Sequence, residues 1–241
     1  MSNKKIKRLF FDIETSPNVG LFWSAGIKQT IDYDNILEER AIICICFKWE
    51  GKGVQYLTWD KHHNDKSMLE KFIKIANTAD ELVGHNGDKY DLAWIRTRCL
   101  FHRIPMFPSY TTVDTLKVSR SKFRFNSNRL DYISKYLGIG KKIKIGGFDL
   151  WKKVMLNDAA ALKKMVNYCK GDVRLLEDVY SEMRNHIPPK TSVTQERRSC
   201  PECGSNHSII HKRRISGAGL VKIQMQCQDC GKFNTIPGTK K

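Results

Sequence analysis

The stretch RLFFDIET, residues 8–15, decides how the first part of the chain is interpreted. Apolar residues run from Leu9 to Phe11, and two acidic residues, Asp12 and Glu14, follow. Residues two apart in a strand point to the same face of its sheet. We therefore expect a strand that presents Asp12 and Glu14 side by side. Two neighbouring carboxylates repel each other unless a cation holds them.

Outward from this strand, the sequence predicts strands first and then strands alternating with helices. Such an order indicates an α/β or α+β fold with a sheet of mixed direction. Ser67, with Glu70 three residues later, is expected to cap the first helix. The predicted strands cover residues 8–14, 40–49, 54–59 and 81–85, and the predicted helices cover residues 67–78, 89–102, 128–137 and 158–184.

Two later segments supply further acidic side chains. The segment HNGDKYD, residues 85–91, joins a short strand to a helix and offers Asp88 and Asp91. Such loops at strand ends are where α/β sheets place functional groups. In YCKGD, residues 168–172, Tyr168 and Asp172 are four apart and share a helix face. Each segment is also compatible with exposed acidic residues that have no catalytic role.

A glycine interrupts the last of these segments. Gly171 costs about 1 kcal/mol relative to alanine inside a helix. We therefore expect another group to approach the helix backbone closely at this position.

Taken in order, FDIET, HNGDKYD and YCKGD resemble the motifs of the DEDD exonuclease superfamily. This superfamily has a ribonuclease H-like fold and includes polymerase proofreading domains and ribonuclease D. The resemblance spans about residues 8–183 and implies a mixed sheet flanked by helices. It assigns Asp12 and Glu14 to the first motif, Asp91 rather than Asp88 to the second, and Asp172 to the third.

The superfamily divides into two branches, which differ in the residue found shortly before the last acidic residue, Asp172. One branch has a histidine where this chain has Asn167, and the other has a tyrosine where this chain has Tyr168. The chain therefore resembles the Tyr branch. Within that branch it is most similar to predicted phage and bacterial exonucleases that begin FDIETSPN.

The resemblance implies a 3′–5′ exonuclease that hydrolyses phosphodiester bonds of DNA at single-stranded ends. Four carboxylates suit two Mg²⁺ or Mn²⁺ ions. We expect Asp12 to bridge both ions, Glu14 and Asp172 to complete one site, and Asp91 to hold the other. Tyr168 is expected to orient the attacking water, because a phenol with a pKa of about 10 is a poor base at neutral pH. The alternatives are an exoribonuclease, a structure-specific endonuclease, and an inactive nucleic-acid-binding module.

Near the C-terminus, four cysteines form two Cys-x₂-Cys pairs with 23 residues between them. This spacing predicts one structural Zn²⁺ ion. Residues 207–214 and 220–226 are expected to be strands, so the segment resembles a zinc ribbon. His207 and His211 are rival ligands, but four thiolates already complete a tetrahedron. The predicted zinc ligands are Cys200, Cys203, Cys227 and Cys230.

Two prolines, Pro188 and Pro189, followed by small polar residues predict a linker. We expect an exonuclease-type domain over residues 1–188, a linker over 189–196 and the zinc ribbon over 197–241. The remaining cysteines lie in apolar stretches and are expected to pack as small core residues. They are Cys44, Cys46, Cys99 and Cys169.

The chain of 241 residues carries 42 Lys and Arg against 25 Asp and Glu, a net charge of +17. Residues 191–241 hold nine basic and three acidic side chains, so their share is +6 and the remainder carries +11. This excess favours a nucleic-acid partner. No stretch approaches the roughly 18 apolar residues of a membrane span, and no signal-peptide pattern is present. We expect no membrane partner and a cytoplasmic location, in a bacterium or a phage-infected cell.

Basic residues interleaved with aromatic ones are typical of a groove for single-stranded nucleic acid. The alternative for each is an ordinary solvated side chain. The basic run at 212–214 is expected at the tip of the ribbon hairpin. The candidate contacts are Thr15, Trp23, Asn86, Lys141, Lys142, Lys144, Lys212, Arg213 and Arg214.

Overall fold

Strand β1 (Arg8–Thr15) lies at the centre of a five-stranded sheet with the order β5-β4-β1-β6-β7. On one side, β4 (Ile42–Trp49) pairs antiparallel with β1, and β5 (Gln55–Thr58) pairs antiparallel with β4. On the other side, β6 (Glu81–Gly84) runs parallel to β1, and β7 (Thr112–Asp114) runs parallel to β6. The sheet is therefore mixed, which confirms the predicted fold class.

The computed structural model describes residues 5–24, 26, 30–143 and 145–238. Lys144, one of the expected nucleic-acid contacts, lies outside these residues. Within the described part of the chain, no helix is both long and apolar enough to cross a membrane.

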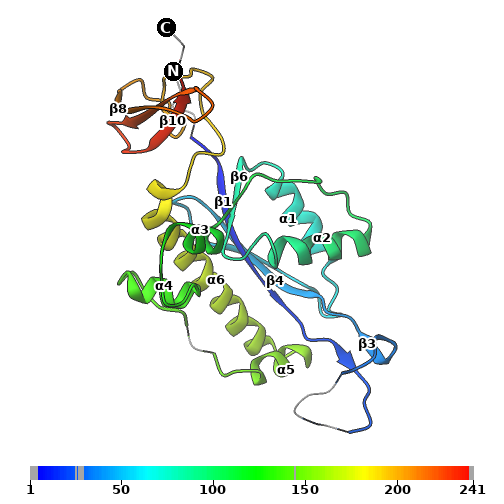
Figure 1. The fold of residues 1–241 in the computed structure, drawn as a ribbon. Helices are drawn as coiled ribbons and strands as arrows, with labels where there is room; N and C mark the ends of the chain where they lie inside the picture. Colours follow the sequence, from blue (N-terminus) through cyan, green and yellow to red (C-terminus); the bar gives the residue numbers. More distant parts are fainter. Residues whose placement is uncertain (1–4, 25, 27–29, 144, 239–241) are drawn as a thin grey trace.

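Helices cover both faces of the sheet (Figure 1). One face packs against α1 (Lys66–Ala76) and α2 (Asp91–His102). The long helix α6 lies along β1 and β4 on the opposite face, together with three shorter helices. The helices on this second face are α3 (Thr115–Lys122), α4 (Leu130–Tyr136), α5 (Asp149–Met155) and α6 (Ala159–Met183).

The side chains of β1 divide between these two layers. Leu9 and Phe11 are buried in the core under α1 and α2, whereas Phe10 is buried in the core under α6. Alternation along the strand places Asp12 and Glu14 on the same face as Phe10. The two acids therefore face α6, the helix that carries Tyr168 and Asp172.

Several short elements are absent from the sequence-based prediction. Strands β2 (Val19–Gly20) and β3 (Ile36–Glu38) form a small two-stranded sheet of their own. The 3₁₀ turn η1 (Tyr33–Asn35) precedes β3, and η2 (Arg184–His186) follows α6. Strand β7 and helices α3 and α5 were also not predicted, because each has only three to eight residues and lacks a long periodic pattern.

The C-terminal segment forms a separate three-stranded antiparallel sheet with the order β10-β9-β8. Its strands are β8 (Ser208–Ile215), β9 (Val221–Cys227) and β10 (Phe233–Pro237). The first two match the predicted hairpin, and β10 is an addition. In Figure 1 this sheet lies beyond the end of β1 at which the strand begins.

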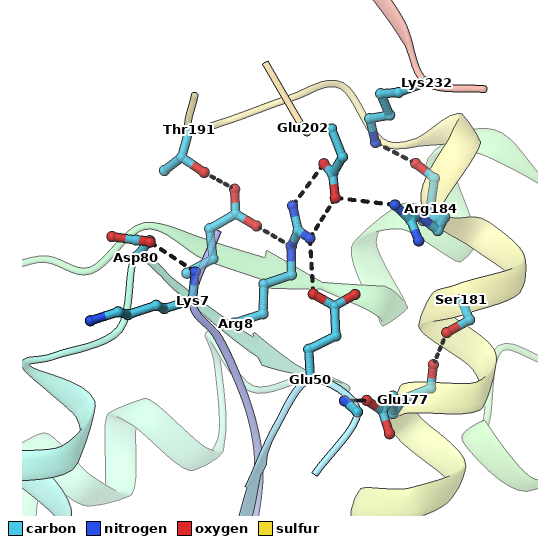
Figure 2. Close-up of polar contacts among 12 residues, drawn as sticks. Lys7, Arg8, Glu50, Asp80, Glu177, Ser181, Arg184, Thr191, Glu202 and Lys232 are labelled. Atoms are coloured by element: carbon cyan, nitrogen blue, oxygen red, sulfur yellow. Dashed lines mark hydrogen bonds and ion pairs between the residues drawn. The ribbon is translucent and has the colours of Figure 1, made fainter. Parts of the chain in front are cut away.

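A buried ion network joins this small sheet to the main one (Figure 2). Arg8, at the start of β1, donates from both terminal nitrogens to the carboxylate of Glu202, at 2.6 and 2.9 Å. Its Nε donates to Glu81 at 2.8 Å, and Glu50 accepts a further bond at 3.2 Å. Arg8, Glu81 and Glu202 are all buried. We call this set the Arg8–Glu202 clasp.

Further bonds secure the clasp on its C-terminal side. Arg184 also donates to Glu202, at 3.2 Å. The buried ammonium of Lys232 donates to the backbone carbonyls of Arg184 and Ile187, at 2.6 and 2.8 Å. Thr191, within the expected linker, donates to Glu81 at 2.5 Å. The linker boundaries stay a prediction, but this segment is hydrogen-bonded to the main body.

Candidate active site

Three carboxylates from two elements meet beside β1. Asp12 and Glu14 come from β1, and Asp172 comes from the facing side of α6; one oxygen of each lies within 4.8 Å of the others. Strand alternation supplies the first two and the helix supplies the third. The structure thus brings together three of the four predicted acidic residues.

The fourth acid, Asp91, occupies the first position of α2. It is buried, and its Oδ1 accepts a hydrogen bond from the backbone amide of Ile13, at 3.0 Å. This bond fixes Asp91 next to β1, between the two acidic residues of that strand. Asp88 instead pairs with Lys117 at 2.6 Å and lies outside the carboxylate cluster.

Burial and mutual repulsion raise the pKa values of these carboxyl groups when no divalent cation is bound. Burial, together with the charges of Asp91, Glu14 and Asp172, raises the pKa of Asp12 well above its ordinary value. Burial and the charge of Asp172 raise the pKa of Glu14 to about 8. Burial raises the pKa of Asp91 to about 7. Burial also raises the pKa of Asp172. A bound divalent cation reverses this effect.

The donor set fits a hard divalent cation. All the clustered atoms are carboxylate oxygens, which Mg²⁺ and Mn²⁺ prefer. Asp172 Oδ1 is buried and has no hydrogen-bond partner among the described residues. An unsatisfied buried acceptor is costly unless something binds it. Asp12, Glu14, Asp91 and Asp172 are therefore the residues that would hold such ions.

A lysine reaches into this cluster from the loop after α4. The ammonium of Lys142 donates to Asp172 Oδ2 at 2.7 Å and lies 5.5 Å from the ring centre of Tyr168. Burial disfavours the charge of Lys142, but the Asp172 carboxylate outweighs burial and raises the Lys142 pKa. Lys142, expected only as a nucleic-acid contact, thus serves as an internal counterion in the site.

Gly171 allows this loop to approach α6. A Cβ atom at Gly171 would lie 2.9 Å from Cδ1 of Ile143, the neighbour of Lys142. The close approach expected from the sequence is therefore made by the Ile143 side chain.

Tyr168 precedes Asp172 by one helical turn and is half-buried on α6. Burial and the charge of Asp172 raise the pKa of Tyr168 to about 12. The phenol therefore keeps its proton at neutral pH, which suits a group that orients water rather than one that removes a proton.

An open cavity of about 390 Å³ adjoins Glu14 and is lined by Thr15, Arg40 and aromatic side chains. The Thr15 hydroxyl bonds to the Tyr90 hydroxyl at 2.9 Å, and Trp151 Nε1 donates to the Thr15 carbonyl at 3.0 Å. Arg40 Nε is buried and lacks a hydrogen-bond partner in the described part of the chain. The aromatic lining residues are Tyr90, Phe148 and Trp151.

Sequence reasoning singled out Thr15 in this cavity but missed Arg40, Phe148 and Trp151. The available signal was the pair of aromatic residues in GFDLW, residues 147–151. This pair lay outside every motif, and the turn that brings it to Glu14 has no sequence signature.

The other expected nucleic-acid contacts have varied surroundings. Trp23 is fully exposed next to the small β2–β3 sheet, and Lys141 is exposed. Asn86 has a left-handed backbone (φ 67°), and its amide donates to Asp114.

The basic run at 212–214 does not occupy a hairpin tip. The tip is formed by residues 216–219, and the run lies within strand β8, with all three side chains exposed. The reason is that β8 continues to Ile215, because residues 213–215 pair with residues 221–223 of β9.

The four C-terminal cysteines form a second cluster suited to a metal ion. Their sulfur atoms lie within 4.8 Å of one another, with Cys200–Cys230 and Cys203–Cys227 separations of 3.6 Å. A tetrahedral Zn²⁺ with bonds of about 2.3 Å requires sulfur separations of about 3.8 Å. The cluster is thus compatible with a zinc ribbon. The rival ligand His207 bonds to Asp229 at 3.4 Å.

Together, a mixed sheet between two helical layers and a carboxylate cluster across β1 and α6 define the class of protein. Residues 9–184 match the RNase_H superfamily, and since this is most of the chain, the protein belongs to that superfamily.

Known relatives agree with this placement. Over 99 residues, 40% of this chain, the sequence is 28% identical to DNA polymerases of Thermococcus hydrothermalis and Thermococcus kodakarensis. The matched stretch is only 6% of each of those polymerases. The family B DNA polymerase of Pyrobaculum calidifontis has a similar fold, with a TM-score of 0.59 and 16% identity over 76% of this chain and 25% of that one.

Proposed function

We propose that the protein is a metal-dependent 3′–5′ exonuclease of the Tyr branch of the DEDD superfamily, acting on single-stranded ends of DNA. The observation that carries this proposal is the meeting of the Asp12, Glu14 and Asp172 carboxylates within 4.8 Å, with Asp91 beside them. Membership of the RNase_H superfamily supports nuclease activity. The Thermococcus relatives are DNA polymerases, which favours DNA over RNA as the substrate.

Two Mg²⁺ or Mn²⁺ ions, held by Asp12, Glu14, Asp91 and Asp172, would stabilise the charge on the reacting phosphate and acidify the attacking water. Tyr168, whose hydroxyl stays protonated, orients that water. With ions bound, Asp172 would no longer need Lys142 as its counterion, and the ammonium could then make a strong charge-assisted contact with the phosphate backbone.

The cavity beside Glu14 is suited to the terminal nucleotide. Phe148 and Trp151 offer aromatic faces for a base, and base stacking contributes about 1–3 kcal/mol. Arg40 also lines this cavity, and its guanidinium would bring a positive charge near a phosphate there. Thr15 lies at the boundary between the cavity and the carboxylates, where it is placed to contact the terminal sugar.

Two other candidate functions use the same fold. An exoribonuclease would use the same carboxylates but would recognise the 2′-hydroxyl group. An inactive nucleic-acid-binding module would need the basic surface but not the carboxylates. The retained set of four acids with Tyr168 favours an active enzyme.

The decisive experiment uses DNA and RNA oligomers labelled at either end, with Mg²⁺, Mn²⁺ or neither added. We expect 5′-labelled DNA to give a ladder of shortened products, and 3′-labelled DNA to release its label in the first step. Asp12→Ala is expected to keep oligonucleotide binding and lose digestion. Preferential digestion of RNA would select the exoribonuclease, internal cuts the endonuclease, and binding without any digestion the inactive module.

A further inference from the structure

Three buried thiols form a cluster immediately behind the carboxylates. Cys44 and Cys46 are two apart in β4 and point to the same face, and Cys169 of α6 lies over them. Their sulfur atoms lie within 4.8 Å of one another, and each residue has no exposed surface. These cysteines were expected to be simple core residues, and nothing in the proposed hydrolysis uses them.

The thiol cluster is in direct contact with a catalytic carboxylate. In the register of β1 with β4, Asp12 is paired with Cys46 and Glu14 with Cys44. Cys169 Sγ lies 3.6 Å from Asp12 Oδ2. The three sulfur atoms therefore lie together, and one of them, Cys169 Sγ, contacts a carboxylate oxygen of Asp12.

These separations are close to those of a tetrahedral metal site. A Zn²⁺ ion with bonds of about 2.3 Å to sulfur and about 2.1 Å to oxygen requires sulfur–sulfur distances of about 3.8 Å and sulfur–oxygen distances of about 3.6 Å. The Cys169–Asp12 distance already matches, and the three sulfur atoms need to move together by an ångström or less.

The surroundings act differently on the three thiols: burial raises the pKa of Cys169 and that of Cys44 is raised too, whereas two basic side chains favour the thiolate of Cys46. Lys170 and Arg174, both on α6, act electrostatically on Cys46. Nearby cations favour the thiolate, the form that binds metals. Thiolates select soft ions such as Zn²⁺ and Cd²⁺, whereas Mg²⁺ selects the all-oxygen cluster. The two adjoining clusters therefore differ in the metal they prefer.

We propose that Cys44, Cys46 and Cys169, with Asp12 as the fourth ligand, form an inhibitory site for thiophilic divalent cations. Binding releases the thiol protons and draws Asp12 away from the carboxylate cluster. Because the thiols are buried, access requires local opening between α6 and β4, so inhibition develops slowly. The binding step stands on its own, whereas the inhibition rests on the proposed nuclease function.

The test of binding uses the full chain and Cd²⁺ as the probe. Ultraviolet charge-transfer absorbance from thiolate to Cd²⁺ counts cadmium–sulfur bonds and ignores carboxylate sites. We expect saturation at seven such bonds per chain, four from the ribbon and three from the core cluster. Cys46→Ala should lower the absorbance towards the level of four bonds. Cys99→Ala removes a buried thiol from the other core layer and should not lower it.

The test of inhibition uses the same three proteins, each measured against its own rate in excess Mg²⁺. Preincubation with Cd²⁺ should inhibit the unaltered chain and Cys99→Ala alike, and the half-inhibitory concentration should rise at least about tenfold in Cys46→Ala. An absorbance limited to four bonds in the unaltered chain overturns the site, whether or not the protein digests DNA. Equal inhibition of all three proteins overturns its inhibitory role.

Discussion

At the scale of single residues, Lys142 brings a positive charge into a cluster that otherwise consists of carboxyl groups. Its ammonium and a divalent cation compete for the same Asp172 carboxylate. The lysine therefore lowers the affinity of the empty cluster for metal while it keeps Asp172 charged and in position.

Replacing Lys142 with glutamine should separate metal binding from catalysis. We expect Lys142→Gln to bind Mn²⁺ at least about threefold more tightly, because a competing charge is removed. Its rate of DNA digestion should fall, because the phosphate backbone loses a cationic contact. Calorimetric titration of Mn²⁺ and a digestion assay measure the two effects. Lys71→Gln, at an exposed position of α1, is the matched control and should change neither by more than twofold.

The raised carboxyl pKa values predict how stability depends on pH without added Mg²⁺ or Mn²⁺. Glu14 has an ordinary pKa of 4.5 and a folded-state pKa of about 8, so the folded chain holds a proton that the unfolded chain has released. This contribution is fully present below pH 4.5 and is lost as the pH rises through about 8.

Urea unfolding at pH 5 and pH 8.5, with the ribbon loaded with Zn²⁺, measures that loss. Between these two values, Glu14→Gln should lose at least about 1 kcal/mol less stability than the unaltered chain, because glutamine carries no proton to release. Glu70→Gln, on the exposed face of α1, should follow the unaltered chain. Identical pH dependence in all three would show that Glu14 is already ionised.

At the scale of elements, regular hydrophobic patterns were predictable and local competition for side chains was not. The alternation in residues 8–15 correctly gave β1 and the shared face of Asp12 and Glu14. The predicted start of α1 is wrong: the helix begins at Lys66, after Asp65, and Ser67 is not its cap. Asp65 does not cap it through its side chain, because that carboxylate binds Arg98 on the neighbouring α2. No local sequence pattern predicts that Arg98, on another helix, binds this carboxylate.

The candidate site divides in the same way. The acids of β1 and α6 were predictable because each lies at a fixed spacing within one regular element. The Lys142 contact and the cavity beside Glu14 depend on irregular segments, residues 137–143 and 145–148, the first of which packs against α6. Spacing along the chain carries little information about such a path.

The Arg8–Glu202 clasp should make a large contribution to the free energy of unfolding. Arg8→Met leaves the buried carboxylates Glu81 and Glu202 without their main partner, and we expect a loss of about 3–5 kcal/mol in urea unfolding. Glu202→Gln keeps the shape but weakens the bonds and should cost about 1–3 kcal/mol. Asp149→Asn, in an exposed pair with Lys152, should cost less than about 0.5 kcal/mol.

At the scale of the whole molecule, the clasp joins the C-terminal three-stranded sheet to the body that carries the candidate active site. Its two partners are 194 residues apart in the sequence, which is why no local pattern predicted the contact. Removing the whole ribbon would also strip Arg8 of Glu202. The role of the C-terminal segment in nucleic-acid binding is therefore better tested by substitutions on its surface.

Replacing Lys212, Arg213 and Arg214 together with alanine tests whether the ribbon grips nucleic acid. If all three contact phosphates, the slope of log affinity against log salt should become shallower by about 2 on single-stranded DNA. A triple alanine variant at the exposed Lys66, Lys71 and Lys74 of α1 removes the same charge elsewhere. Equal slopes in these two variants would leave the ribbon without a specific role in binding.

The clasp also has a consequence for how the chain is made. Arg8 leaves the ribosome 194 residues before Glu202, which lies in the first Cys-x₂-Cys pair. Until then, Glu81 and Glu50 are the carboxylates that Arg8 can pair with. Since domains fold as they emerge during synthesis, the central strand reaches its final environment only once residue 202 has been translated and has emerged. Translation that stops before residue 202 should therefore leave a loosened nuclease body that proteases degrade readily.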